Sequence, residues 1–513
     1  MARSNVHRRD FLKTTAAGAA ALSLTAASYS KVLGANDTVR IGFLGVGGRC
    51  QQHIDVILKM QEEKKGVTPV AVCDVWNGDK SLGRGKGRGL YPSAERCGIK
   101  DDGKHVTKDY RKVLEQKDVD VVAIATPDHW HAKMAIDAML AGKDVYCEKP
   151  MVRTIDEAHA VVDTWKKTNR VMTVGVQSMA DPTWAKAYEL IRSGGIGKIM
   201  QGQTSYYRNS KVGQWRYYPL TRDMTPQTID WDMFLGHAFD VNGVKLGPSP
   251  KEMPFDRAVF AQWRCYWPFG GGMYTDLFVH QTTHLIAAMG VRYPARVVGG
   301  GGIYLEYDGR DVPDVATIVA DYDEGCQVLV TATMCNDHRI EECIRGHTGT
   351  LLFENVRGQG FGFKILPQNI GDAPRGPSGE VVKEGTFVPG GLKSDDTYAL
   401  YENFLSCVRD KRRDTLSTPE LGAAAFTTVA LGVKSYREGK ALFWDKENRR
   451  PTEANASWAE RWEQRSKKRG KPSHIIGWQG GDKGSLLEPP DYMKLAGPWI
   501  NGKDPAGAAG AEH

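Results

Sequence analysis

The chain has 513 residues, of which 41% are hydrophobic and 25% are charged, and its formal net charge is +7. This is ordinary globular composition, and the length suffices for two or three domains. No internal apolar run is long enough to span a bilayer. The weak positive charge, scattered along the chain, predicts no nucleic-acid partner.

The first 35 residues are predicted to be a targeting segment. Arg8 and Arg9 precede a Phe-Leu-Lys triplet and an alanine-rich apolar run from Thr14 to Ala27. This pattern resembles a twin-arginine export signal, which carries folded proteins out of the cytoplasm. The other interpretation is a basic N-terminus without a targeting role. We expect residues 1–35 to be a signal peptide, the mature protein to be periplasmic or extracytoplasmic, and no stable membrane anchor.

A strand, a glycine turn, a helix, a second strand and an acid follow the targeting segment in that order. The strand Val39–Leu44 ends at the glycine turn Gly45–Cys50, and a helix is predicted from there to about Met60. The next strand, Val70–Cys73, ends at Asp74. This order is typical of a dinucleotide-binding unit. The third glycine of the usual fingerprint is replaced by a cysteine, which loosens the match.

Each residue of this turn has a predicted role in holding a dinucleotide. Gly45 permits the tight turn, Gly47 lets the backbone approach a pyrophosphate, and the helix N-terminus supplies N–H donors. Asp74 would accept hydrogen bonds from the adenosine ribose and repel a 2′-phosphate, which favours NAD over NADP. Four cations in the following glycine-rich loop could meet a phosphate or remain solvated: Lys80, Arg84, Lys86 and Arg88. The predicted cofactor-binding residues here are Gly45, Gly47, Gly48, Arg49 and Asp74.

Two further strands end in polar residues at the same predicted sheet edge. The apolar run Val119–Ala125 is broken by Thr126–His129, and after a helix over His131–Leu140 the strand Asp144–Cys147 stops at Glu148–Pro150. Open parallel sheets bind ligands at the carboxyl ends of their strands. A lysine placed there, Lys149, is therefore a candidate for chemistry. The predicted cofactor-binding residues of this edge are Thr126, Pro127, His129, Glu148, Lys149 and, at the end of the next strand, Gln177.

The alternation of strands and helices is lost after about residue 178. We expect helices over Thr154–Thr168, 396–412 and 419–437, and strands over Val171–Val176, 199–208, 294–305, 315–334 (in two runs) and 349–366. The predicted fold class is α/β: an N-terminal Rossmann domain over 36–177, then an α+β domain over 178–445 with a large, mainly antiparallel open sheet. Residues 446–513 are predicted to be a C-terminal extension.

Asp276, His280 and His284 follow the glycines Gly270–Gly272 at intervals of four, in a segment predicted to be helical. This spacing places them on roughly one helical face. An Asp beside a His suits proton transfer, because the carboxylate orients the imidazole and stabilises its charged form. The spacing also fits a partly buried helix whose histidines only form hydrogen bonds. A metal site is the third interpretation, but nothing nominates a fourth ligand, and we predict no metal.

Four motifs occur in order: the glycine turn, Thr126–His129, Glu148–Pro150, and Gly270–Gly272 with Asp276 and His280. Over roughly residues 37–440 the chain resembles the Gfo/Idh/MocA family, which includes glucose–fructose oxidoreductase and inositol dehydrogenase. The resemblance implies a Rossmann domain followed by an α/β domain whose open sheet commonly forms the oligomer interface. A homodimer or homotetramer is therefore expected.

The resemblance also implies catalytic roles. Lys149 would hydrogen-bond and polarise the reacting hydroxyl, His280 would be the general base, and Asp276 would orient His280. Many relatives carry a second Asp seven residues after the first. Here that position is Thr283 with His284 beside it, and this departure leaves the substrate open.

Aromatic and basic residues cluster in two segments of the second domain, 206–218 and 263–267. Aromatic faces and polar side chains suit sugar rings, although core or interface packing explains the aromatics equally well. The predicted substrate-binding residues are Tyr206, Arg208, Trp263, Arg264 and His284.

These features predict an exported NAD(P)-dependent oxidoreductase acting on a secondary alcohol of a sugar or polyol. Free NAD is expected to be scarce outside the cytoplasm, so we hypothesise that the cofactor is loaded before export and stays bound. It would then be restored on the protein, for example by alternating oxidation and reduction of two sugars. The alternative is an NAD-dependent glycosidase that oxidises a ring hydroxyl, eliminates the aglycone and reduces the sugar again. A third interpretation is a sugar-binding protein without chemistry.

Overall fold

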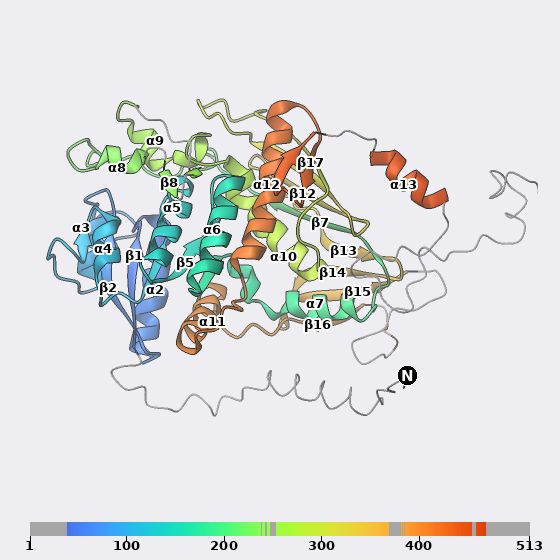
Figure 1. Ribbon diagram of the computed structural model, residues 1–513, viewed down its shortest axis with the longest axis horizontal. Coiled ribbons are helices and arrows are strands. Elements are labelled where there is room, and N and C mark those ends of the chain that lie inside the picture. Colours follow the sequence, from blue (N-terminus) through green and yellow to red (C-terminus); the bar gives the residue numbers. More distant parts are fainter. Residues whose placement is uncertain are drawn as a thin grey trace, which may run out of the picture.

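The computed structural model describes residues 38–236, 239–241, 244–246, 253–368, 381, 383, 385–453 and 458–467. Two large sheets organise these residues (Figure 1). The predicted signal peptide and most of the predicted C-terminal extension lie outside the described residues. Within these ranges, every helix is too short or too polar to cross a membrane.

The first sheet has six parallel strands in the order β3-β2-β1-β4-β5-β6, which confirms the predicted Rossmann domain. The order reverses between β1 and β4, and sheets of this kind bind ligands at the carboxyl edge beside the reversal. The strands are β1 (Val39–Leu44), β2 (Val67–Cys73), β3 (Val106–Thr107), β4 (Val121–Ile124), β5 (Asp144–Glu148) and β6 (Met172–Gly175). The helices are α2 (Gly48–Glu62), α3 (Leu90–Arg96), α4 (Tyr110–Glu115), α5 (Asp128–Leu140) and α6 (Ile155–Thr168).

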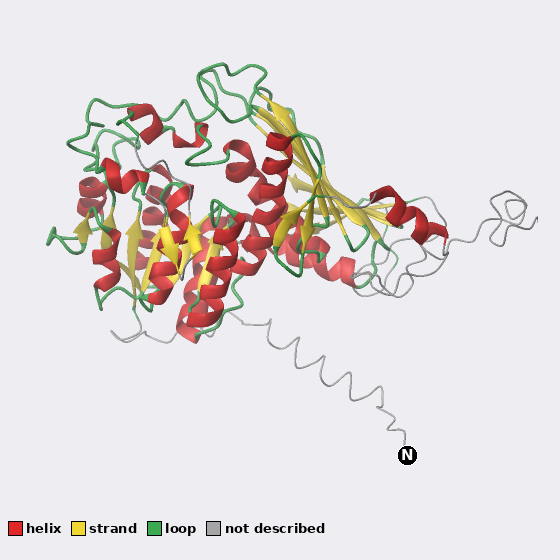
Figure 2. Ribbon diagram, turned by 45° about the horizontal axis from the view of Figure 1, so that its top comes forward, coloured by secondary structure: helices red, strands yellow, loops and turns green. Residues whose placement is uncertain are grey.

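The strands that carry the site are short and apolar because helices cover both faces of the sheet (Figure 2). Every residue of β4 is buried, as is every residue of β5 after the first, which is the pattern of strands inside a parallel sheet. Helix α5 starts at Asp128, three residues before the predicted start at His131. Pro127 can precede it directly because a helix does not use the N–H group of its capping residue.

The second sheet has ten strands in the order β16-β15-β14-β13-β7-β12-β11-β10-β17-β18. Only β7 and β12 pair in parallel, so the predicted mainly antiparallel sheet is confirmed. The predicted strand over 349–366 is a hairpin of two strands. The strands are β7 (Ile199–Tyr207), β10 (Arg296–Gly302), β11 (Val315–Tyr322), β12 (Cys326–Thr333), β13 (Glu342–Gly346), β14 (Gly349–Val356), β15 (Gly360–Pro367), β16 (Thr386–Pro389), β17 (Leu442–Asp445) and β18 (Arg450–Thr452).

Helices α7 (Pro182–Arg192), α10 (Val279–Met289) and α12 (Pro419–Glu438) pack on one face of this sheet. Several short helices and strands between residues 231 and 265 lie beside the first domain. Just before them, Ile229 forms a backbone bridge with Trp76 of the first domain. These elements are α8 (Trp231–Leu235), β8 (Phe239–Val241), β9 (Val244–Leu246), α9 (Arg257–Ala261) and η4 (Trp263–Cys265). The remaining elements are η3 (Gln177–Ala180), the π-helix η5 (Tyr274–Phe278), α11 (Asp396–Asp410) and α13 (Trp458–Lys467).

Helix α11 returns to the first domain although it belongs to the predicted second one. Tyr401 of α11 stacks on Tyr146 of β5 with ring centres 4.3 Å apart, and Phe404 is fully buried in the same cluster as Ile41 and Phe43. Helix α11 therefore follows the predicted domain boundary near residue 177 in sequence but packs on the sheet that precedes it. Residues distant in the sequence complete the apolar core on that face of the first sheet.

We predict that Gly299→Ala destabilises the protein and that Gly300→Ala, its immediate neighbour, does not. A Cβ at Gly299 would stand 2.0 Å from the carbonyl oxygen of Gly432 in α12, whereas a Cβ at Gly300 would meet no atom within 4 Å. The added methyl group would push α12 away from the sheet, and overpacking of this kind lowers the free energy of unfolding by about 1–3 kcal/mol. Thermal unfolding of the two variants measures the effect, and equal melting temperatures would contradict this close helix–sheet contact.

Candidate active site

The glycine turn packs between the carboxyl ends of β2 and β4. Gly45 has φ of +81°, and a Cβ on it would stand 2.6 Å from the Cγ2 of Thr126. Its N–H donates to the carbonyl oxygen of Cys73 at 2.8 Å. Only glycine fits this position, on grounds of both conformation and space. A Cβ at Gly47, by contrast, would meet nothing within 4 Å, so the helix N-terminus faces open space.

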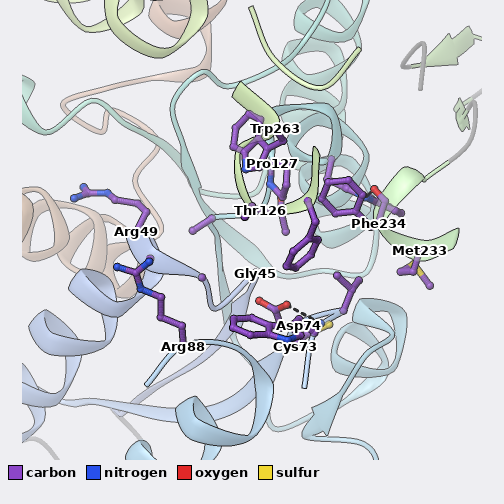
Figure 3. Close-up of a pocket in the computed structure, with 18 of the residues that line it drawn as sticks. Gly45, Arg49, Cys73, Asp74, Arg88, Thr126, Pro127, Met233, Phe234 and Trp263 are labelled. Atoms are coloured by element: carbon purple, nitrogen blue, oxygen red, sulfur yellow. Dashed lines mark hydrogen bonds between the residues drawn. The ribbon is translucent and has the colours of Figure 1, made fainter. Parts of the chain in front are cut away.

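Two adjoining cavities meet at this turn. The first, here called the glycine-turn cavity, has a volume of about 180 Å³ and runs from Asp74 to Trp263 (Figure 3). The second, here called the lysine cavity, has a volume of about 640 Å³ and contains Lys149 and His280. Seven residues line both: Gly48, Arg49, Arg88, Ala125, Thr126, Tyr218 and Arg264. A ligand that spans the strand reversal, as an extended dinucleotide does, would occupy both cavities.

Asp74 directly follows β2 and lines the glycine-turn cavity, and Pro127 lies across from it. An oxygen of the Asp74 side chain accepts the N–H of Trp76 at 2.9 Å. Removal from water raises the pKa of Asp74 to about 6, against the opposing effect of backbone N–H groups. Asp74 therefore lines the cavity at the carboxyl end of β2, and its contact with a ribose hydroxyl stays a prediction.

Two guanidinium groups lie at the N-terminus of α2 with unused donors. The Nη2 of Arg49 and the Nε of Arg88 are buried and have no hydrogen-bond partner in the described structure. The Arg88 guanidinium carbon lies 3.4 Å from where a Cβ on Gly48 would stand, so the arginine lies directly against the first residue of α2. Buried donors without acceptors are costly. A diphosphate at this position would satisfy both groups, and the residues present therefore fit a dinucleotide.

Glu148 links the glycine turn to the lysine at the end of β5. It is buried and accepts the Nε of Arg49 at 2.8 Å and the Nε2 of Gln177 at 2.9 Å. Burial opposes the ionisation of Glu148, but Arg49 and His53 outweigh it and hold its pKa well below the usual range. The carboxylate thus fixes Arg49 and Gln177, which both line the lysine cavity.

Lys149 is held by a residue of the second domain. Its Nζ donates to the backbone oxygen and to the Oδ1 of Asp276, both at 2.7 Å. The Nε of Arg264 lies 3.2 Å from the same Oδ1, and the indole of Trp215 donates to Oδ2 at 3.1 Å. Burial raises the pKa of Asp276, but Lys149 and Arg264 outweigh it and hold this pKa well below its usual range. The carboxylate of Asp276 therefore stays ionised beside the Lys149 Nζ.

His280 lines the lysine cavity but does not form the predicted pair with Asp276. Among the described residues no hydrogen bond joins the two, since Asp276 is engaged by Lys149, Arg264 and Trp215. Asp276 lies in the π-helix η5, whereas His280 lies in α10. A π-helical turn has more residues than an α-helical one, so a spacing of four does not keep the two side chains on one face. The expected orienting role of Asp276 is corrected accordingly.

Two other predicted site histidines lie outside both cavities. His129 is buried, with its Nε2 2.7 Å from the carbonyl oxygen of Phe234, and the predicted cofactor contact does not fit this position. His284 stacks on Trp184 at 4.0 Å, and its Nε2 lies 2.7 Å from Glu342. It therefore packs between α7 and β13, which does not fit the predicted substrate contact. Among the described residues, no cluster of three or more His, Cys, Asp or Glu could hold a metal.

The other predicted substrate residues line the cavities, and further residues join them. Tyr206 and Arg208 lie in the lysine cavity, Trp263 lies in the glycine-turn cavity, and Arg264 lines both. The N-terminus of α11 also reaches the lysine cavity, which the sequence interpretation missed. The polar run at 394–397 before an amphipathic helix is its only sequence signal. The residues added there are Asp395, Asp396 and Thr397, together with Gln281 from α10.

The geometry defines the class: a dinucleotide-binding α/β protein in which a second domain completes a polar cavity around a lysine of the first. Residues 39–176 match the model of the Gfo/Idh/MocA family, an oxidoreductase family with an NAD-binding Rossmann fold. The first domain of this chain is therefore similar to the NAD-binding domain of that family. Residues 5–25 match the signal sequence of the twin-arginine translocation pathway, which indicates export to the periplasm and confirms the predicted localisation.

Similar proteins include sugar-active enzymes. A glycosyl hydrolase family 109 protein of Shewanella baltica is 30% identical over 249 residues, which cover 42% of this chain and 51% of that protein. The chain spans about half the length of the curated relatives it matches. An aldose–aldose oxidoreductase of Caulobacter crescentus, solved with glycerol, has a TM-score of 0.55 at 18% identity, covering 79% of this chain and 99% of that one.

Levoglucosan dehydrogenase, solved with NADH, has a TM-score of 0.53 at 20% identity and covers 79% of this chain and 98% of that one. These two solved structures share the two-domain fold of this chain.

We predict that Arg88→Gln speeds the release of bound nucleotide, whereas Arg84→Gln, in the same loop but exposed and outside both cavities, leaves release unchanged. A charge-assisted hydrogen bond contributes about 1.5–3 kcal/mol, so release should be about 10–100 times faster. Stopped-flow fluorescence of bound NADH, with excess NAD as the competitor, measures the rate. Equal release from the wild type and Arg88→Gln would show that this guanidinium does not hold the nucleotide.

We predict that His280 makes stability fall at low pH. Removal from water and the positive charge of Lys149 lower the pKa of His280 to about 3, whereas an unfolded histidine titrates near about 6.5. The unfolded chain therefore binds a proton at this residue first, and stability is lost as pH falls from about 6.5 towards 3. The stability advantage of the wild type over His280→Asn should shrink between about pH 7.5 and pH 5 in thermal unfolding.

His105 is the matched control, because Asp102 is the main cause that raises its pKa above the ordinary value. Its contribution is full at low pH and is lost as pH rises, so the advantage of the wild type over His105→Asn should grow as pH falls. The same pH trend in both variants would contradict the assignment for His280.

Proposed function

We propose that the protein is an exported, NAD-dependent oxidoreductase that acts on a secondary alcohol of a sugar or polyol. The observation that carries the proposal is the lysine cavity, where a lysine bound to Asp276 and a histidine of lowered pKa both line the space beside the dinucleotide-binding edge. The cofactor, when bound, supplies a hydride acceptor. The residues of the chain bind the sugar, orient it and move its hydroxyl proton.

Lys149 is proposed to orient the reacting hydroxyl. An ammonium group has three N–H donors, and the backbone oxygen and Oδ1 of Asp276 take two of them. One donor is left for a substrate oxygen. Because Asp276 fixes the lysine from the second domain, the donor keeps its direction and the substrate oxygen is held in a reactive position.

His280 is proposed to be the general base. Its lowered pKa keeps the ring neutral at physiological pH, so that it has a free lone pair to accept the hydroxyl proton. In the proposed arrangement Asp276 acts on Lys149 rather than on His280. The imidazole faces the cavity without a fixed partner among the described residues, and it would gain its orientation from the bound sugar.

The position of the protein outside the cytoplasm supports a retained cofactor that is regenerated on the protein. The likeness to an aldose–aldose oxidoreductase fits alternating oxidation and reduction of two sugars. The similarity to glycosyl hydrolase family 109 supports the alternative, a glycosidase that oxidises a ring hydroxyl transiently. Turnover of a chromogenic glycoside without an added acceptor would support the glycosidase. Its absence, with oxidation of one sugar coupled to reduction of another, would support the oxidoreductase.

We predict that Lys149→Met retains nucleotide but loses its reduction by sugars, with Lys112→Met, an exposed lysine of the same domain, as the control. The purified mature protein is first denatured, and mass spectrometry identifies the released nucleotide. The absorbance of reduced nicotinamide is then followed after addition of a sugar panel. Loss of a positioned proton-transfer group should slow the reaction by about 10²–10⁴-fold. Normal reduction in Lys149→Met would contradict the assigned role, and sugar binding by a wild type that never reduces its nucleotide would indicate a binding protein.

A further inference from the structure

Arg208 is a cation fixed to the wall of the lysine cavity directly after β7. Its N–H donates to the carbonyl oxygen of Thr333 at 3.0 Å, and it forms a backbone bridge with Asn336. Its guanidinium carbon lies 4.6 Å from the centre of the Tyr206 ring, whose hydroxyl accepts from Nη2. Both residues line the cavity. Backbone and side chain are therefore held in place before any ligand enters.

No carboxylate is bound to Arg208 in the part of the chain that the structure describes. Arg49 is paired with Glu148, and Lys149 and Arg264 share Asp276. Three cations at this end of the cavity, Lys149, Arg208 and Arg264, thus surround one carboxylate. The substrate end of the site carries an excess of positive charge.

The other acids of the cavity are already engaged. Asp395 accepts the N–H groups of Thr397 and Tyr398 as the cap of α11. Asp396 bonds to the hydroxyl of Thr397 and lies near Arg49, on the cofactor side. Neither forms an ion pair with Arg208 among the described contacts. A bound molecule with a negative charge would give Arg208 the ion-pair partner that the described residues do not supply.

Arg208 remains charged in this position. Burial opposes its charge, but Tyr206 and Asp276 nearby outweigh burial and raise its pKa. A guanidinium has five N–H donors, and one side-chain acceptor, the Tyr206 hydroxyl, is present. The remaining donors form a planar fork that matches the two oxygens of a carboxylate. A neutral sugar hydroxyl offers one oxygen and no charge, and would leave the cation unbalanced.

We propose that Arg208 binds a carboxylate of the substrate, so that the preferred substrates are acidic sugars, such as uronic or aldonic acids, rather than neutral ones. This inference rests on the proposed function, because it assumes that the sugar enters the lysine cavity. It adds a specificity-determining residue that acts on the substrate away from the reacting hydroxyl. It also explains why the site tolerates a third cation beside Lys149 and Arg264.

The test compares acid and neutral partners of the same sugar on the nucleotide-bound protein. D-glucuronate with D-glucose, D-galacturonate with D-galactose, and D-gluconate with D-sorbitol are titrated while tryptophan fluorescence is followed. At least one acid should bind about 10–100 times more tightly than its neutral partner, as expected for a charge-assisted pair. Arg208→Gln should abolish the preference and Arg208→Lys should keep part of it. Lys211→Gln, an exposed residue outside the cavity, should keep all of it.

Two outcomes would overturn the inference: no acid in the panel binds better than its partner, or Arg208→Gln keeps the full preference. The second outcome would mean that Arg208 only packs against Tyr206. The same titrations record reduction of the bound nucleotide, which tests the proposed function separately. Reduction by neutral sugars alone would reject the acidic substrate and leave the oxidoreductase intact. Tight binding of acids that never reduce the nucleotide would reject the oxidoreductase and leave the carboxylate subsite intact.

Discussion

The site depends on one shared carboxylate. Asp276 of the second domain accepts from Lys149 of the first, while Arg264 and Trp215 hold it from its own side. An ion pair withdrawn from water is stable only if its remaining polar atoms are also satisfied, and here Arg264 and Trp215 supply further donors to the carboxylate. The lysine therefore has a defined position only when both domains are folded and docked.

The cavities beside this carboxylate differ in how their charges are balanced. Towards the first domain, Glu148 neutralises Arg49 and leaves spare N–H donors of Arg49 and Arg88 at the helix end. Towards the second domain, Asp276 is outnumbered by cations. Hydrogen bonds that are preorganised inside a protein cost little reorganisation when charge arrives. Both ends of the combined cavity are thus suited to anionic groups, with the neutral His280 between them.

Much of the fold follows from local patterns in the sequence. Apolar runs of four to seven residues mark the buried parallel strands, and the polar residues after them identify Asp74, Thr126 and Lys149 at one sheet edge. Interactions between distant segments do not leave such patterns. The segment that contains the π-helical turn has a sequence that fits an α-helix equally well. The sequence therefore did not predict that Asp276 binds Lys149 or that His284 packs on Trp184. From the sequence, Arg88 was only one of four possible phosphate contacts. The pattern of a glycine-rich loop does not show that this loop returns to the N-terminus of α2.

The stacking of Tyr401 on Tyr146 affects how the chain can fold during its synthesis. The nucleotide-binding sheet is complete by residue 175, yet the helix that covers one of its apolar faces emerges from the ribosome more than 200 residues later. During translation the part of that face around Tyr146 is uncovered, and an isolated N-terminal half would expose an apolar patch prone to aggregation. We therefore expect the two domains to fold as one cooperative unit. A machinery that exports only folded chains would receive the protein after its last helices have closed over the first strands.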